Sequence, residues 1–220
     1  MKRNTAHRIY SVLLNQYIKD DTSLHFLNFD NPFQILIMTI LSAQTTDVIV
    51  NSVKDRLFES YPDPRSMSEA DICNIEEIIK STGFYRIKSK NIKKTSEMLV
   101  GEFDGKVPNN MENLVRLPGV GRKTANIVLN HAYGINAGIA VDTHVKRVSF
   151  RLGMTENSDP ERIEKDLTSL FPKDIWGRIN YLLISHGRMV CNAKKPACKE
   201  CCINEYCRYY IEDIENYSQQ

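Results

Sequence analysis

Apolar residues recur at every third or fourth position along almost the whole chain, and this spacing constrains the fold more than any other feature. It places apolar side chains along one face of an α-helix. No segment shows the strict alternation of polar and apolar residues that is typical of a strand. We therefore predict an all-α fold with nine or ten helices. Clear examples of the spacing are Ala6, Ile9, Leu13, Tyr17 and Ile72, Ile75, Ile79.

Helix-breaking residues divide this pattern where helices should begin or end. Pro32 and Pro160 each follow a residue that can cap a helix, which predicts helix starts at both positions. Gly83 is expected to end another helix. Segment 134–138 contains two glycines that interrupt the helical spacing, and it is therefore the best candidate for a hinge.

Length and composition favour an ordinary globular protein. The 220 residues are 42% hydrophobic and 25% charged, enough for one sizeable core or two smaller ones. The longest apolar stretch, 35–41, is too short to span a bilayer, and the first residues lack the apolar part of a secretion signal. We expect an intracellular, cytoplasmic protein. The net charge of +2 does not indicate a polyanionic partner, whereas the basic run between Arg86 and Lys94 fits either nucleic acid or a solvated helix face.

Four of the six cysteines follow the pattern Cys191-x6-Cys198-x2-Cys201-x5-Cys207, and this crowding indicates a metal site. A disulfide framework is the alternative, but it is typical of small secreted domains. Thiolates in a short segment hold either tetrahedral zinc or an iron–sulfur cluster. The local spacing alone favours zinc as the commoner occupant.

The remaining two cysteines lie outside this pattern. Cys202 could replace its neighbour Cys201 as a metal ligand, so the sequence leaves that choice open. Cys73 lies beside Ile72 and Ile75 on an apolar helical stripe. We therefore predict that Cys73 is a core residue.

Residues 117–125 read Leu-Pro-Gly-Val-Gly-Arg-Lys-Thr-Ala, which predicts a tight glycine turn that opens a helix. Glycines let the backbone approach a ligand closely, and the N–H groups at a helix start bind phosphate oxygens. A nucleotide-binding P-loop is excluded, because it needs a different spacing after a strand. An ordinary helix–turn–helix corner is the alternative. The basic residues favour contacts with a DNA backbone from Gly119, Gly121, Arg122 and Thr124.

Two residues near this turn could do chemistry. Lys123 could bind a phosphate through its charge, or act as a nucleophile if Arg122 and the helix start favour its uncharged form. The residues alone favour the phosphate contact. Asp142 precedes a helical stretch and suits an N-cap, although a carboxylate there could also accept a proton or stabilise a cation. His144 fits a structural role or a place near a phosphate.

Together these residues resemble the endonuclease III family of helix-hairpin-helix DNA glycosylases. Four elements match the family in order and spacing, and they extend over nearly the whole chain. Each alone could arise by chance, whereas the combination is specific. The elements are Leu-Ser-Ala-Gln at 41–44 with Asp47, the hairpin at 117–125, Val-Asp-Thr-His at 141–144, and the cysteine loop.

The resemblance implies two helical domains that flank a DNA-binding cleft. A six-helix domain with the helix-hairpin-helix would cover residues 22–134, and an iron–sulfur domain would combine residues 1–21 with 135–220. The resemblance replaces zinc by a [4Fe–4S] cluster and leaves Cys202 out of the ligand set. Lys194, in the basic part of the loop, would touch DNA phosphates. The implied cluster ligands are Cys191, Cys198, Cys201 and Cys207.

The resemblance also implies a base-excision repair activity. A monomer would bind duplex DNA, remove oxidised pyrimidines and cleave the strand 3′ to the abasic site by β-elimination. Lys123 would be the nucleophile that forms a Schiff base and Asp142 its partner, which reverses the order of roles given above for Lys123. Gln44 would fill the place of the flipped nucleotide, and Phe84 would be an apolar wedge on the opposite strand. Val115 stands where some members carry glutamate, which leaves the proton transfers of the elimination open.

Two other functions compete with this interpretation. One is a monofunctional glycosylase that excises a base and leaves the strand intact. The other is a non-catalytic protein that binds DNA through the same hairpin or transfers electrons through the cluster. The presence of both Lys123 and Asp142 argues against the non-catalytic alternative.

Overall fold

The computed structural model describes residues 1–19 and 24–217. These residues form helices and connecting turns without any strand, which confirms the predicted all-α fold. They contain twelve α-helices where nine or ten were expected. Two of the helices, α4 with six residues and α7 with four, are too short to show a repeating apolar pattern. No helix in the described part of the chain has the length and apolar composition needed to cross a membrane.

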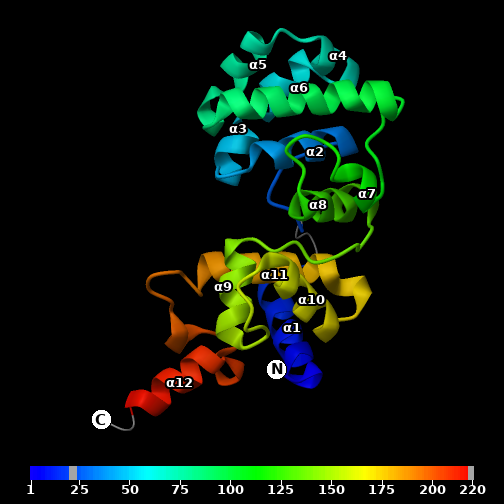
Figure 1. Ribbon diagram of the computed structural model, residues 1–220. Coiled ribbons are helices and arrows are strands. Elements are labelled where there is room, and N and C mark those ends of the chain that lie inside the picture. Colours follow the sequence, from blue (N-terminus) through cyan, green and yellow to red (C-terminus); the bar gives the residue numbers. More distant parts are fainter. Residues whose placement is uncertain (20–23, 218–220) are drawn as a thin grey trace. The chain divides into compact units, whose positions relative to one another are not determined.

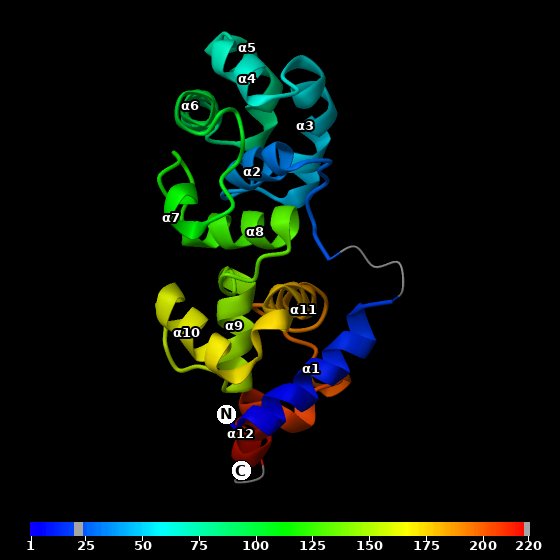
Figure 2. The ribbon, with the colours of Figure 1, turned by 90° about the vertical axis from the view of Figure 1, so that its right-hand side faces the viewer.

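The chain divides into two compact units, each with its own set of helices (Figure 1, Figure 2). The continuous unit is His25–Ala137, and the discontinuous unit combines Met1–Leu24 with Gly138–Gln220. The later boundary falls within segment 134–138. The predicted boundary between residues 21 and 22 lies outside the described residues.

The continuous unit is built around α2, which spans Pro32–Leu41. All side chains from Phe33 to Leu41 are buried, since α3, α6 and α8 pack against this helix (Figure 1). A helix that is apolar on every face is stable only when other elements enclose it. The other elements of the unit are α3 (Asp47–Ser60), α4 (Pro64–Glu69), α5 (Ile72–Ile79), η1 (Lys80–Thr82), α6 (Tyr85–Glu102), α7 (Met111–Leu114) and α8 (Arg122–Tyr133).

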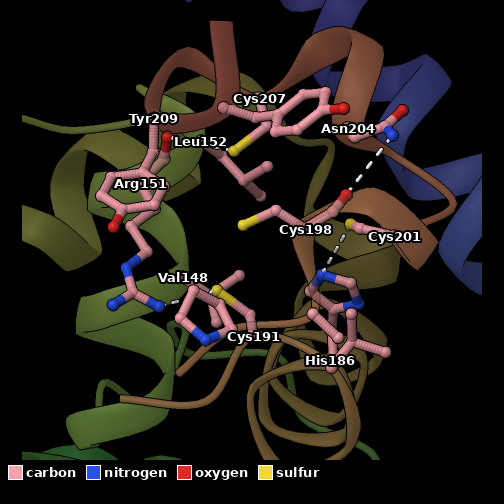
Figure 3. A pocket seen from close by; sticks show the side chains of 14 residues that line it. Val148, Arg151, Leu152, His186, Cys191, Cys198, Cys201, Asn204, Cys207 and Tyr209 are labelled. Carbon is pink, nitrogen blue, oxygen red and sulfur yellow. Dashed lines mark hydrogen bonds between the residues drawn. The ribbon is translucent and has the colours of Figure 1, made fainter. Parts of the chain in front are cut away.

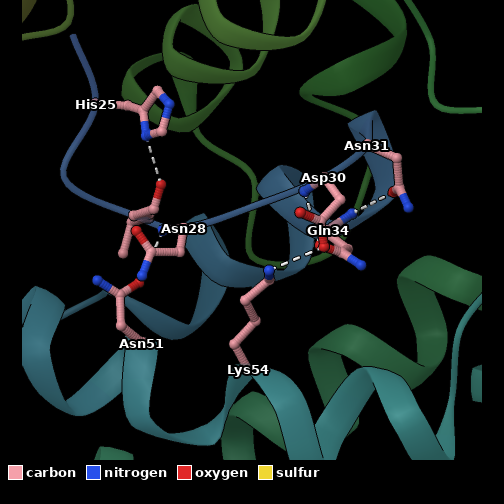
Figure 4. A network of polar contacts seen from close by, with 8 residues as sticks. His25, Asn28, Asp30, Asn31, Gln34, Asn51 and Lys54 are labelled. Carbon is pink, nitrogen blue, oxygen red and sulfur yellow. Dashed lines mark hydrogen bonds and ion pairs between the residues drawn. The ribbon is translucent and has the colours of Figure 1, made fainter. Parts of the chain in front are cut away.

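A network of polar contacts fixes the start of α2 (Figure 4). The Asn31 side chain accepts a hydrogen bond from the Gln34 amide at 3.0 Å, and the Gln34 side chain accepts one from the Asp30 amide at 2.8 Å. Lys54 Nζ lies 2.9 Å from Asp30 Oδ2, and this hydrogen bond lowers the pKa of the Asp30 carboxyl group. The predicted helix start at Pro32 is confirmed, with Asn31 as its N-cap.

The discontinuous unit joins the N-terminal helix to the last third of the chain. Helix α1 packs on α11, and α11 packs on α9. Ile9 and Leu13 are the buried face of α1, at the spacing that predicted this helix. The predicted start at Pro160 is also confirmed. The unit consists of α1 (Arg3–Tyr17), α9 (Thr143–Leu152), α10 (Pro160–Leu170), η2 (Lys173–Ile175), α11 (Trp176–Met189), η3 (Cys198–Glu200), η4 (Asn204–Tyr206) and α12 (Arg208–Tyr217).

The prediction that Cys73 is a core residue is wrong. Cys73 is exposed, whereas Ile75 and Ile79 form the buried face of α5. Successive helix residues are about 100° apart, so a residue two positions before Ile75 points away from that face. An apolar neighbour in the sequence is therefore a poor guide to the side on which a cysteine lies.

Candidate functional site

The hairpin between α7 and α8 requires a glycine at position 119. Gly119 has a φ of +78°, in the left-handed region that disfavours other residues. A Cβ atom there would lie 2.9 Å from Asn91 Nδ2 and 3.2 Å from Ile40 Cγ2. The neighbouring Leu117 and Val120 are buried in the core. The turn is thus held against α2 and α6, and it brings α8 to a defined starting point.

The first turn of α8 presents polar groups outward. Gly121 is the N-cap in an extended conformation, and an added Cβ there would meet no atom within 4 Å. Arg122 and Lys123 are exposed and Thr124 is partly buried. The first N–H groups of a helix have no partner within the helix, and they carry the positive end of its dipole. This helix start can therefore receive an anion such as a phosphate oxygen.

Three exposed residues of the continuous unit, Gln44, Phe84 and Asp104, have a left-handed backbone without being glycine. Gln44, in the turn between α2 and α3, has a φ of 54°, and Phe84, which precedes α6, has a φ of 48°. The Phe84 side chain is 63% exposed. Each such backbone costs about 1–3 kcal/mol, and such residues concentrate at functional sites. Gln44 and Phe84 are the two of these residues that the family resemblance assigns to entry into DNA.

In the discontinuous unit, Asp142 begins α9. Its Oδ1 accepts a hydrogen bond from the Val145 amide at 2.7 Å, which confirms the predicted N-cap geometry. His144 Nδ1 lies 3.1 Å from Arg147 Nη2, and Arg147 also donates to the Gly187 carbonyl at 2.9 Å. Burial lowers the pKa of His144, and the Arg147 charge adds to this shift while Asp142 opposes it. The lowered pKa favours the neutral form of His144, which lies beside Gly187 of α11.

The four patterned cysteines line one pocket (Figure 3). Apolar side chains such as Val148 and Leu152 form much of its wall. Cys202 is exposed and does not line it, and Cys73 belongs to the other unit. The structure therefore brings Cys191, Cys198, Cys201 and Cys207 together around one pocket.

Two basic side chains contact these thiols. Arg151 Nη1 donates to Cys191 Sγ at 3.3 Å, and His186 Nε2 lies 3.5 Å from Cys201 Sγ. The other ring nitrogen of His186 lies 2.9 Å from the Tyr17 hydroxyl. Burial lowers the pKa of His186 to about 4, so its ring is neutral at pH 7. Burial also raises the pKa of Cys201 to about 11, which favours its thiol form when no cation is bound.

Arg151 also shapes the basic loop after Cys191. It donates to the Asn192 carbonyl at 2.8 Å and to the Ala193 carbonyl at 2.9 Å. The following Lys194 is exposed. Arg151 and His186 were not among the residues predicted from the sequence for this site. The sequence signal for Arg151 is its spacing from Arg147, because two arginines four residues apart lie on one face of a helix. Both contact the cysteine loop, and Arg147 donates to the Cys191 carbonyl at 3.0 Å.

Comparison with known proteins identifies the family. Residues 37–173 match the family of HhH-GPD superfamily base excision DNA repair proteins. Endonuclease III of Synechocystis sp. is 50% identical over 206 residues, which is 94% of this chain and 93% of that protein. The chain belongs to the endonuclease III family. Endonuclease III of Escherichia coli K12 is 42% identical, over 83% of this chain and 86% of that protein.

Solved structures of endonuclease III share the fold. A trapped endonuclease III–DNA covalent intermediate superimposes with a TM-score of 0.90 at 37% identity, covering 97% of this chain and 99% of the other. A thermostable thymine-DNA glycosylase, 24% identical with a TM-score of 0.85, shows the fold alone. As an endonuclease III family member, the chain is a base-excision repair enzyme that combines DNA glycosylase and abasic-site lyase activities.

Proposed function

We propose that this enzyme removes oxidised pyrimidines from duplex DNA and cleaves the strand 3′ to the abasic site, with Lys123 as its nucleophile. The observation that carries the proposal is the place of the Lys123 amine. It is exposed in the first turn of α8, directly after a turn whose glycine is required by the packing. An amine that is to attack a bound sugar must be accessible and close to a phosphate-binding backbone.

The proposed reaction has two parts. The Lys123 amine attacks C1′ of the damaged nucleotide, the glycosidic bond breaks, and the base leaves with a proton. After the sugar ring opens, the lysine and C1′ form a Schiff base. Loss of a C2′ proton then expels the 3′ phosphate oxygen, which breaks the strand, and hydrolysis of the Schiff base returns the free amine. The covalent endonuclease III–DNA intermediate of a relative supports this route.

Asp142 is the proposed partner of the lysine. One of its oxygens is fixed by the Val145 amide. Within the part of the chain that the structure describes, no hydrogen bond occupies its Oδ2 atom. A carboxylate that is held in this way can accept a proton or stabilise the cationic sugar without reorganising.

The DNA contacts divide into positioning contacts and insertions. The positioning contacts hold phosphates, and the inserted residues are Gln44 beside the flipped nucleotide and Phe84 on the opposite strand. His144, whose lowered pKa favours the neutral form, is a neighbour of a phosphate. The enzyme's monomeric state and its intracellular location stay predictions. The proposed phosphate contacts are Gly119, Gly121, Arg122, Thr124 and Lys194.

We further propose a [4Fe–4S] cluster on Cys191, Cys198, Cys201 and Cys207. The donor set supports it, since four thiols and no carboxylate line the pocket. Among the described residues, no three acidic, histidine or cysteine side chains converge as the ligands of one metal ion do. Four thiolates alone would suit either a single zinc ion or a cluster, and the preference for the cluster comes from the family resemblance. When bound, the cluster would crosslink the loop and hold the four cysteines as thiolates.

Borohydride trapping on DNA with an abasic site tests the nucleophile. The wild-type enzyme should form a covalent adduct, because borohydride reduces the Schiff base. Lys123→Gln should abolish the adduct, whereas Lys94→Gln, which changes an exposed lysine of α6, should keep it. An adduct that persists in Lys123→Gln would overturn the assignment. A monofunctional enzyme would instead need alkali to reveal the strand break.

The role of Asp142 is tested by a substitution that keeps the helix cap. Asparagine caps a helix about as well as aspartate, so Asp142→Asn should unfold at the same temperature as the wild type. The rate of base excision should fall by about 10²-fold or more, since the carboxylate charge is lost. Single-turnover kinetics measure this rate. A full rate in Asp142→Asn would reject its catalytic role.

Analysis of the purified protein tests the cluster. Iron and sulfide should both be present, with visible absorption from thiolate-to-iron charge transfer. Cys198→Ser should lose them, and Cys202→Ser should retain them because Cys202 does not line the pocket. A colourless, zinc-containing wild-type protein would exclude the cluster. A panel of duplexes with one defined lesion each then gives the lesion spectrum.

A further inference from the structure

Two left-handed turns of the continuous unit, those at Gln44 and Phe84, are joined by hydrogen bonds. Lys88, on α6, donates from Nζ to Thr45 Oγ1 at 2.6 Å and to the Thr82 carbonyl at 2.8 Å. The Thr45 hydroxyl also donates to the Thr82 carbonyl. Thr45 directly follows Gln44, and Thr82 lies two residues before Phe84. One ammonium group thus connects the two turns that carry the proposed DNA-inserting side chains.

Lys88 is unusual because it is a buried lysine that forms no ion pair with an acidic side chain of the described residues. Its exposed fraction is only 4%, and both of its bonded partners are neutral oxygens. Among the described residues, no carboxylate lies within ion-pair distance of its Nζ. Burial lowers the pKa of Lys88 accordingly. Burying an unpaired charge costs free energy that an apolar side chain of similar length would avoid.

The position of the contacts suggests what offsets this cost. Gln44 and Phe84 have the strained backbones described above, and strain of this kind persists only where surrounding contacts hold it. Lys88 contacts Thr45, which follows Gln44, and Thr82, which lies two residues before Phe84. Its own amide also bonds the Phe84 carbonyl at 3.1 Å, within the first turn of α6. The side chain therefore fixes both turns relative to the same helix.

We propose that Lys88 is a positioning residue that holds the Gln44 turn and the Phe84 turn in register, so that both side chains enter DNA together. This inference rests on the proposed function, which assigns Gln44 and Phe84 to the two strands. Insertion at one base pair needs both side chains at once, and a displacement of about 1 Å can cost 10²-fold in rate. Lys88 acts through these residues and does not touch the reacting atoms.

The test compares variants that remove the connection with a matched control on the same helix. Lys88→Met keeps an apolar stem of similar length and removes the donor, and Thr45→Val removes the hydroxyl and keeps the shape. Lys93→Met is the control. Lys93 also lies on α6, and its Nζ donates to a backbone carbonyl, that of Ala70, at 2.6 Å. Ala70 lies outside both turns.

Base flipping is measured by the fluorescence of 2-aminopurine placed beside a lesion, together with single-turnover excision. Lys88→Met and Thr45→Val should each lower the flipping signal and slow excision by about 10–100-fold, while Lys93→Met changes neither. On a preformed abasic site, which has no base to unpair, the loss should be smaller. The double variant should be no worse than either single variant, since both remove one connection. Lys88→Arg, which keeps a donor, should recover part of the rate.

Two further variants separate this inference from the proposed function. If Gln44→Ala and Phe84→Ala leave flipping intact, the proposed DNA insertion itself is wrong. If they impair flipping whereas Lys88→Met and Thr45→Val do not, the positioning role of Lys88 is overturned. Additive losses in the double variant would overturn it as well. Should Lys88→Met fail to fold, Thr45→Val alone decides, because it deletes a single hydroxyl.

Discussion

The two units hold their candidate functional residues in different ways. The continuous unit surrounds α2 with one apolar core, and its functional side chains stand on short turns anchored to that core. In the discontinuous unit, the loop from Cys191 to Cys207 contains only short 3-10 turns, and polar bonds from α9 hold it. The first site should therefore depend on packing, and the second on polar bonds and on whatever the thiols bind.

Of the changes considered, the removal of one thiol should have the largest effect, and it should destabilise only the discontinuous unit. Cys198→Ser should prevent cluster assembly, because each ligand contributes to the folding energy of a metal site. The backbone amides of the loop and of α12 should then exchange rapidly, while those of α2 and α8 keep their protection. Hydrogen–deuterium exchange measures both. Cys202→Ser serves as the control, since that side chain lies outside the pocket.

Two outcomes would contradict this prediction. Unchanged protection of the loop in Cys198→Ser would show that polar bonds such as those of Arg151 suffice without a metal. Loss of protection in α2 would show that the two units do not unfold independently. Either outcome would remove the distinction between the two kinds of site.

A cavity in the core should have the next largest effect, and it should fall on the continuous unit. Leu36 on α2 is fully buried. Leu36→Ala should lower the free energy of unfolding by about 2–5 kcal/mol, because the surrounding helices cannot close the space completely. Urea denaturation followed by circular dichroism gives this value. Loss of the iron absorption at a urea concentration where the wild type retains it would contradict the separation of the units.

Local signals in the sequence predicted the helices and some residues of the candidate sites. They did not predict the contacts between segments that are distant in the sequence. Asn31 before Pro32 and Asp142 before α9 are correct caps, because capping depends on residues within one turn. The cysteine spacing likewise indicated a cluster of thiols but left the choice between Cys201 and Cys202 open, and Cys201 is the one that lines the pocket. The bonds from Lys88 to Thr45 and from Arg151 to Cys191 join segments about 40 residues apart, and no periodic pattern encodes them.

A buried histidine should make the stability of the continuous unit depend on pH. Burial, together with the neighbouring His25, lowers the pKa of His131 to about 4, against 6.5 for an unshifted histidine. The native state thus favours the neutral ring. Stability should be complete above pH 6.5 and fall as the pH drops toward 4, because the unfolded chain binds the proton more readily. The difference between these two pKa values corresponds to a loss of roughly 3 kcal/mol at most in the free energy of unfolding.

Urea denaturation at pH 7, 5.5 and 4.5 measures this dependence. His131→Gln should flatten the decline, while His7→Gln, which changes an exposed histidine of α1, should leave it unchanged. An equal decline in wild type and His131→Gln would assign the acid sensitivity to other groups, such as His186 or the carboxylates.

The smallest expected effect distinguishes the two glycines of the hairpin. Gly119→Ala should cost about 1–3 kcal/mol, because alanine disfavours a φ of +78° and its Cβ would press on Asn91. Gly121→Ser should leave stability unchanged or slightly raised, because its backbone is extended, the space around it is open, and serine caps helices well. Thermal denaturation measures both. If Gly121→Ser nevertheless weakens binding to an abasic duplex, that glycine serves the approach of DNA and Gly119 serves the fold. Equal destabilisation by both would mean that the packing against α2 and α6 extends to the start of α8.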